Sequence, residues 1–137
     1  MGDDRPPADD RLAIAAELPP ALRRLLVGYA ATADRVRVAE LAYHDCTASV
    51  AASLKGGPRR GAQIAMAEAF ERLADAVVEL QEGRAAVRSQ SEAENLSPGA
   101  LLTLDDALAI AGGDCDGYLA ARTYEQVREV AGRRHAV

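Results

Sequence analysis

One uninterrupted run covers residues 20–54 and reads PALRRLLVGYAATADRVRVAELAYHDCTASVAASL. Its only proline is the first residue, and Gly28 is its one interior glycine. Apolar side chains recur in it every seven residues, at Leu22, Tyr29, Val36, Tyr43 and Val50. A seven-residue apolar repeat is typical of a long amphipathic helix that packs against a partner along its length. The run therefore predicts one helix over residues 20–54.

The rest of the chain divides at glycine and proline clusters. Residues 55–61, KGGPRRG, end the first helix, because glycine after a last turn followed by proline is a strong stop signal. Apolar spacings of three and four continue beyond it and break again at residues 112–117, GGDCDG. We expect helices over residues 62–93, 98–111 and 117–131, and a short helix from Asp9 or Asp10 to Glu17.

Helix lengths select the architecture. At about 1.5 Å per residue, each long helix spans roughly 50 Å, whereas a compact chain of this size is about 37 Å across. The two shorter helices end to end nearly match that length. The sequence therefore predicts an all-α, elongated antiparallel helical bundle of two long helices and a broken third, with a short N-terminal helix. We expect one domain over residues 9–132, a flexible arm at 1–8 and a tail at 133–137.

Composition excludes several functional classes. The formal net charge is −5, and an acidic surface is a poor partner for nucleic acid, so we expect none. No apolar run approaches the roughly 18 residues that a membrane-spanning helix needs, and the first residues lack the apolar core of a signal peptide. We expect a cytoplasmic protein with no membrane partner, in which Cys46 and Cys115 are free thiols.

The first long helix carries a second, weaker apolar stripe. Its members are Val27, Ala31, Val38, Leu41, Ala48 and Ala52. An apolar face beyond the one used by the bundle needs a cover, which the folded-back N-terminal helix, a second copy of the chain or another protein could supply. We interpret the chain as a non-catalytic interaction or assembly module. The predicted partner contacts are Val27, Val38, Leu41 and Glu40, with Arg59 and Arg60 of the basic loop as an anion or acidic-partner contact.

An alternative enzyme reading rests on two residues of the same helix. Arg37 is followed by six residues and then His44, and this spacing resembles the Arg–His motif of the HEPN ribonucleases, which are also small helical bundles. The resemblance implies that Arg37 and His44 would cleave RNA at a dimer interface. The match covers residues 37–44 only and lies on the first long helix, whereas the family's motif usually lies toward the C-terminus.

A third reading is a small-ligand sensor. In the expected register, Glu40 and the break at residues 112–117 fall at similar heights along the bundle. This predicts a polar notch at mid-bundle formed by Glu40, Asp75, Asp114 and Asp116.

Metal and cofactor chemistry does not fit the residue spacing. Residues 112–117 are similar to part of a calcium loop, but Gly112 and Thr123 would stand where carboxylates are needed. Glu40 and His44 are four residues apart, whereas carboxylate-bridged di-iron bundles use a spacing of three. We expect no metal and no cofactor.

Overall fold

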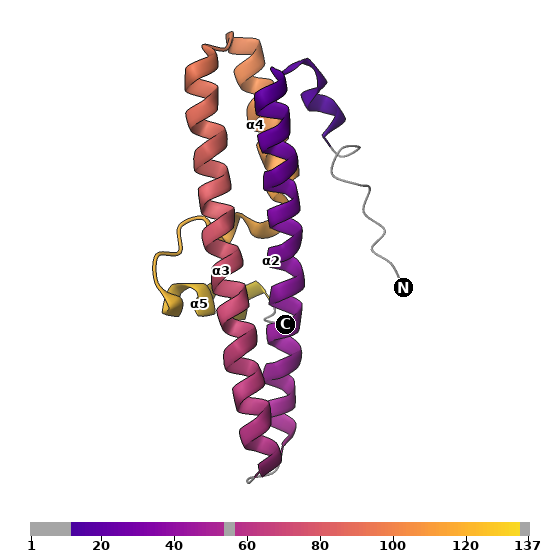
Figure 1. Cartoon of the computed structure of the whole chain (residues 1–137), viewed down its shortest axis with the longest axis vertical. Coiled ribbons are helices and arrows are strands. Elements are labelled where there is room, and N and C mark those ends of the chain that lie inside the picture. The colour runs from indigo at the N-terminus through magenta and orange to yellow at the C-terminus, as the bar shows by residue number, and fades with distance from the viewer. Residues whose placement is uncertain (1–11, 54–56, 135–137) are drawn as a thin grey trace.

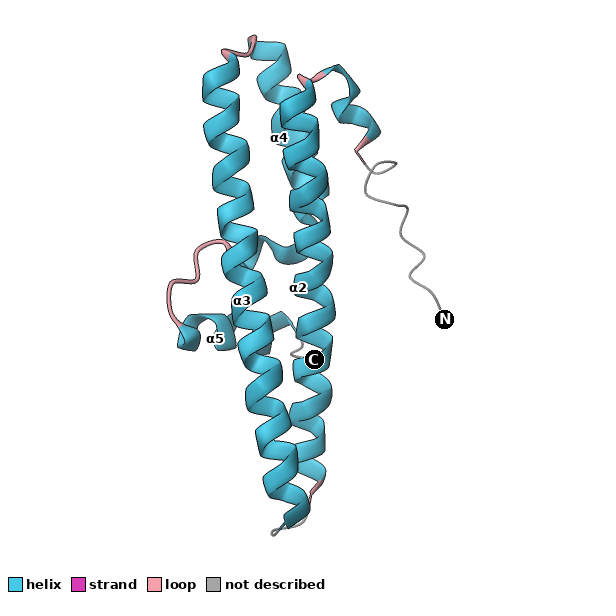
Figure 2. Ribbon diagram, viewed as in Figure 1, coloured by secondary structure: helices cyan, strands magenta, loops and turns pink. Residues whose placement is uncertain are grey.

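The computed structural model describes residues 12–53 and 57–134, and in that part the chain is almost entirely helical (Figures 1 and 2). The elements are the 3-10 helix η1 (Ala13–Glu17), α2 (Pro20–Ala52), α3 (Gly57–Glu94), α4 (Pro98–Gly112), the 3-10 helix η2 (Gly113–Tyr118) and α5 (Tyr124–Arg134). The predicted all-α fold and the elongated bundle are confirmed. The predicted arm at residues 1–8, Leu54 and residues 135–137 lie outside the described residues.

Two long antiparallel helices, α2 and α3, form the body of the molecule (Figure 1). The seven-residue stripe of α2 lies in their seam, where its first four members are buried and Val50 is half-buried. Helix α3 supplies Leu73, Val77, Leu80 and Val87 to the same core. Each such side chain contributes about 1.5–3 kcal/mol when it leaves water, so this seam is the main source of stability.

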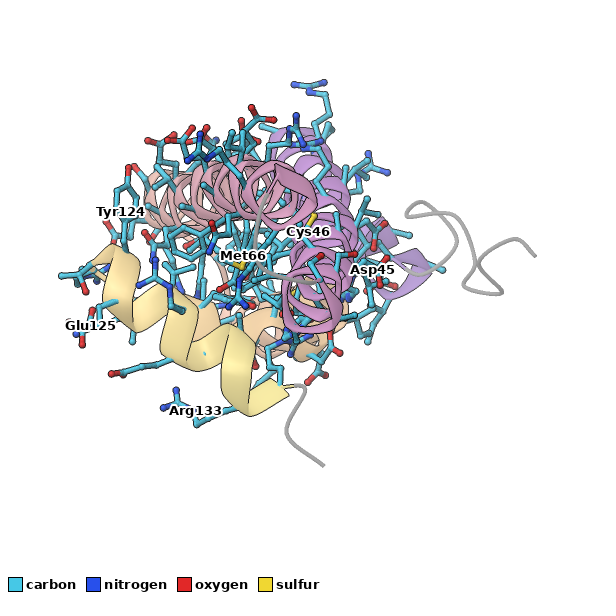
Figure 3. The ribbon with its side chains drawn as sticks, turned by 90° about the horizontal axis from the view of Figure 1, so that it is seen from below. Asp45, Cys46, Met66, Tyr124, Glu125 and Arg133 are labelled. Carbon is cyan, nitrogen blue, oxygen red and sulfur yellow. The ribbon has the colours of Figure 1, made fainter. Side chains whose placement is uncertain are left out.

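The remaining elements cover only one face of the α2–α3 pair. Viewed along the bundle from below, α4 and α5 lie on the same side of the two long helices (Figure 3). Helix α4 begins at Pro98, where the Ser97 side chain accepts a hydrogen bond from the Ala100 amide at 3.2 Å and so caps the helix. It packs along the upper half of the hairpin through Leu104 and Leu108, and α5 crosses the hairpin lower down (Figure 1).

The broken third helix of the bundle is divided at other residues than predicted. We expected a helix over residues 117–131, but 113–118 form η2 and α5 begins only at Tyr124. Gly113 has a φ of +56°, a conformation that glycine adopts freely, and this redirects the chain without fully ending its helical turns. The Thr123 hydroxyl accepts a hydrogen bond from the Gln126 amide at 3.1 Å, which fixes the start of α5.

Two further boundaries were wrong. Helix α3 begins at Gly57, five residues earlier than expected, because Pro58 lies in its first turn, where a helix needs no backbone N–H. Arg133 and Arg134, expected in a tail, form the last turn of α5. No helix within residues 12–53 and 57–134 combines the length and apolarity that crossing a membrane requires.

Candidate functional site

The face of the α2–α3 pair opposite α4 and α5 carries a groove of about 550 Å³. Its lining residues are Asp34, Arg35, Val38, Ala39 and Ala42 of α2 and Arg72, Asp75, Ala76 and Glu79 of α3. Among the residues that the structure describes, no element covers this groove. Its floor is formed largely by alanine, and small side chains at a helix surface allow the backbone of another helix to approach closely.

Val38 is the most prominent apolar group in the groove. Its side chain remains 68% exposed, and Leu41, one turn further along the same edge of α2, remains 56% exposed. Burying a valine or leucine side chain contributes about 1.5–3 kcal/mol, so Val38 and Leu41 would each contribute this free energy if a partner covered them. These residues belong to the second stripe predicted from the sequence.

The 3-10 helix η1 covers only one end of that stripe. Val27 is half-buried and lines a small hollow together with Leu12 and Ala16. Further along α2, Ala48 and Ala52 are exposed in the same way as Val38 and Leu41. The described part of the N-terminal segment therefore shields Val27 and leaves the rest of the second stripe open.

Charged residues frame the groove in a regular order. The Arg35 guanidinium donates to the Glu79 carboxylate across the groove at 3.2 Å, so these two residues lie at the same level of α2 and α3. Both side chains are more than half exposed, so this ion pair contributes little to stability. Arg72 and Asp75 lie lower on α3 and form no ion pair with any residue in the described ranges.

A polar cluster, buried at Glu40 and Arg37 and open to solvent at Asp114, lies on the other side of α2. The Glu40 carboxylate, on a residue only 3% exposed, accepts hydrogen bonds from the Tyr118 hydroxyl and, at 2.5 Å, from Arg134 Nε. Arg134 also pairs with Asp114, whose carboxylate lies 3.2 Å from Nη2. Arg37 completes the cluster, because its Nε donates to Asp114 at 2.8 Å. These contacts attach η2 and the end of α5 to the middle of α2.

The electrostatics of the cluster follow from burial and pairing. Burial, together with the hydrogen bond to Glu40, raises the pKa of Tyr118. Burial raises the pKa of the neighbouring Cys115 thiol to about 11. Burial alone would raise the pKa of Asp114, but hydrogen bonds and positive charge from Arg37 and Arg134 outweigh it and lower that pKa. The charged groups of the cluster are thus paired with one another.

The two residues of the HEPN-like pattern are both engaged in structural contacts. Arg37 is buried, and its Nη1 and Nη2 donate to Asp34 at 2.6 Å and to the Gly112 carbonyl at 3.1 Å. His44 is half-buried, and its Nε2 lies 3.1 Å from the carbonyl oxygen of Ala131. All three side-chain nitrogens of Arg37 thus have protein partners, and neither residue faces the open groove.

The four residues of the predicted notch are only partly brought together. Glu40 and Asp114 share Arg134 as a partner, as the register arithmetic suggested. Asp75 lines the groove on the opposite side of α2, and Asp116 is exposed on η2. The space between the acidic groups is occupied by guanidinium groups and Tyr118, which the sequence reasoning did not include.

The basic loop predicted at the hairpin tip is helical where the structure describes it. Arg59 and Arg60 lie in the first turn of α3, half-buried and exposed respectively. Among the described residues, no three His, Cys, Asp or Glu side chains are grouped so as to hold a metal ion. Both cysteines are free.

The chain matches no protein-family model, no curated protein and no solved structure.

Proposed function

We propose that this protein is a non-catalytic assembly module that pairs with a second copy of itself through the groove between α2 and α3. The observation that carries the proposal is the exposure of Val38 in a groove that no described element covers, with Leu41 also exposed one turn further along α2. Contiguous apolar surface on a soluble helical bundle is typical of an interface.

The charged residues of the groove are arranged so that two copies of the groove can pair through opposite charges. Because Arg35 contacts Glu79, the midpoint of the groove lies between Val38 and Ala39 on α2 and between residues 75 and 76 on α3. A two-fold axis through this midpoint and at right angles to the helices lays two copies antiparallel. It brings Arg72 of one protomer over Glu79 of the partner subunit, and the reverse.

The apolar groups match under the same axis. Val38 of one protomer meets the alanine floor of the other, so its exposed side chain enters a space that small residues leave open. No like charges of the groove are placed opposite each other. Because Arg72 and Glu79 carry opposite charges at equal distances from the midpoint, antiparallel pairing of two copies is favoured over parallel pairing.

The available area is sufficient for a stable dimer. Helix α2 has 33 residues, so it is about 50 Å long, and two adjacent helices about 10 Å wide present a face of roughly 1,000 Å². Each partner in a standard-sized interface buries about 800 Å². A dimer through this face thus needs no contribution from the rest of the surface.

The first experiment measures mass in solution by light scattering after size exclusion. The wild-type chain is expected at twice the 14.4 kDa of one copy. Val38→Glu buries a charge without a partner and is expected to raise the dimer Kd at least 30-fold, which corresponds to about 2 kcal/mol. Leu102→Glu is the matched control, because Leu102 on α4 is also 68% exposed and lies outside the groove.

A second experiment tests the antiparallel register. Arg72→Glu places two carboxylates opposite each other and is expected to weaken the dimer about tenfold. Combining it with Glu79→Arg restores opposite charges across the axis, and adding Arg35→Glu keeps an ion pair between α2 and α3 within each protomer. The Kd of this triple variant is expected to return to within about threefold of wild type. A triple variant that is no tighter than Arg72→Glu alone would contradict the register. A wild-type monomer at all concentrations would leave a different protein as the partner and end the self-assembly proposal.

A further inference from the structure

A second hollow lies on the other edge of α3, away from the α2–α3 groove. It has a volume of about 370 Å³ and separates α3 from the segment that leads through residues 119–123 into α5. Its walls are apolar, with Val77 and Val78 on α3 and Val127 on α5. Volumes of about 300–1,000 Å³ and largely apolar walls are typical of sites for small molecules.

The hollow is held open by specific hydrogen bonds. The Gln81 side-chain amide donates to the carbonyl oxygens of Ala121 at 2.6 Å and Tyr118 at 2.9 Å, which fastens the irregular segment to α3. At the other end of the segment, the Arg122 amide donates to the Gln126 side chain at 2.5 Å. A segment fastened at both ends does not need to be ordered on binding, so a ligand would lose little affinity to that cost.

One cation lines this apolar space without a carboxylate partner. Arg122 is exposed, and its guanidinium makes a single contact within the described residues, a long 3.4 Å approach of Nη1 to the Leu119 carbonyl oxygen. Glu125 and Glu129, on the α5 turns that follow, form no ion pair with it. A guanidinium with donors to spare suits a carboxylate, which it can bind through two parallel hydrogen bonds.

We propose that this hollow binds a small amphiphilic carboxylate. The apolar body of the ligand packs against Val77, Val78 and Val127, and its carboxylate pairs with Arg122 at the edge. Charge complementarity favours an anionic ligand. A purely apolar ligand would leave the donors of the Arg122 guanidinium unused, and a cationic ligand would be repelled by it. This proposal is independent of the dimer, because the hollow and the α2–α3 groove share no lining residue.

The test is a titration of the full chain with octanoate, followed by the amide resonances in ¹H–¹⁵N spectra. Saturable shifts are expected around residues 74–81 and 121–127, with a Kd on the order of 0.1–1 mM for so small a ligand. 1-Octanol, which has the same chain without the charge, is the matched ligand and is expected to bind at least tenfold more weakly.

Three variants separate the parts of the site. Arg122→Gln is expected to weaken octanoate at least tenfold and to leave 1-octanol unchanged. Val78→Trp fills the hollow from a position that is already half exposed, and it is expected to abolish both. Arg133→Gln, an exposed arginine on the last turn of α5, is the control and is expected to change neither.

Two results would overturn the proposal. One is the absence of localised, saturable shifts with octanoate up to 10 mM, about tenfold above the weakest expected Kd. The other is equal binding of octanoate and 1-octanol that Arg122→Gln leaves unchanged, because the hollow would then be an apolar cavity without a carboxylate site.

Discussion

Two buried tyrosines should respond differently to loss of the hydroxyl group. Tyr118 and Tyr29 are both essentially inaccessible, with 0% and 1% exposure. The Tyr118 hydroxyl donates to the buried Glu40 carboxylate, whereas the Tyr29 hydroxyl lies near the Arg84 guanidinium but forms no hydrogen bond of good geometry among the described residues. Replacement by phenylalanine keeps the ring and its packing in each case, so the comparison isolates the hydroxyl group.

The expected changes in the free energy of unfolding follow from the hydrogen-bond partner of each hydroxyl group. A hydrogen bond to a charged acceptor contributes about 1.5–3 kcal/mol, so Tyr118→Phe is expected to lower the free energy of unfolding by about 2 kcal/mol. For a chain of this length that corresponds to a Tm lower by roughly 6–10 °C. Tyr29→Phe removes a buried hydroxyl group whose approach to Arg84 falls short of a well-formed hydrogen bond, so its free energy of unfolding is expected to stay within about 0.5 kcal/mol of wild type or to increase.

The assay is urea unfolding followed by far-ultraviolet circular dichroism. It is best carried out in the Val38→Glu background, because dimerisation would add a concentration-dependent contribution to the measured stability. Tyr118→Phe within 0.5 kcal/mol of its parent would contradict the role assigned to the polar cluster, where 0.5 is about the smallest net value of one hydrogen bond. Equal losses in the two variants would show that the hydroxyl environments do not differ as described.

Further predictions concern Gly113, Asp114 and Cys115 of η2, with Gly28 of α2 as a comparison. Folding lowers the pKa of Asp114 from 3.8, so the contribution of its carboxylate to the free energy of unfolding is complete above about pH 4 and is lost as the pH falls through the lower folded-state pKa. Asp114→Asn is therefore expected to flatten the loss of stability below pH 4 in acid titrations of unfolding. Gly113→Ala is expected to cost about 2 kcal/mol or more in urea unfolding, because its Cβ would stand 2.0 Å from Arg37 and its φ is positive, whereas Gly28→Ala, with open space around it, is expected to gain up to about 1 kcal/mol. Burial raises the pKa of the Cys115 thiol to about 11, so in a Cys46→Ser variant, where Cys115 is the one cysteine left, it is expected to react with a disulfide reagent at pH 8 only as fast as the fold opens; rapid labelling of that variant without denaturant would contradict its placement.

Local sequence pattern was sufficient for the long helices and insufficient for what joins them. The stripe from Leu22 to Val50 predicted α2 because every turn of a helix repeats the same local rule. Glu40 was recognisable as a discordant residue near that seam. Its partners Tyr118 and Arg134 are 78 and 94 residues away in sequence, and no local pattern links residues at such separations.

The groove was visible from the sequence only in part. Val38 and Leu41 stood out as a second apolar stripe, but Arg72 and Glu79 resembled any other charged residues on an exposed helix face. Their significance depends on the level of α3 relative to α2, which the contact between Arg35 and Glu79 shows. The start of α5 was missed for a different reason, because the glycines before it were a stronger helix-break signal than the Thr123 cap.

Pairing of two copies through the face of α2 and α3 around Val38 can be tested by the mass in solution of the wild type, Val38→Glu and Leu102→Glu, measured by light scattering over a range of concentrations. The wild type and the Leu102→Glu variant are expected at twice the 14.4 kDa of one copy, and the Val38→Glu variant at 14.4 kDa. A wild type that stays at 14.4 kDa at every concentration, or a Val38→Glu variant that dimerises as well as the wild type, would contradict this pairing.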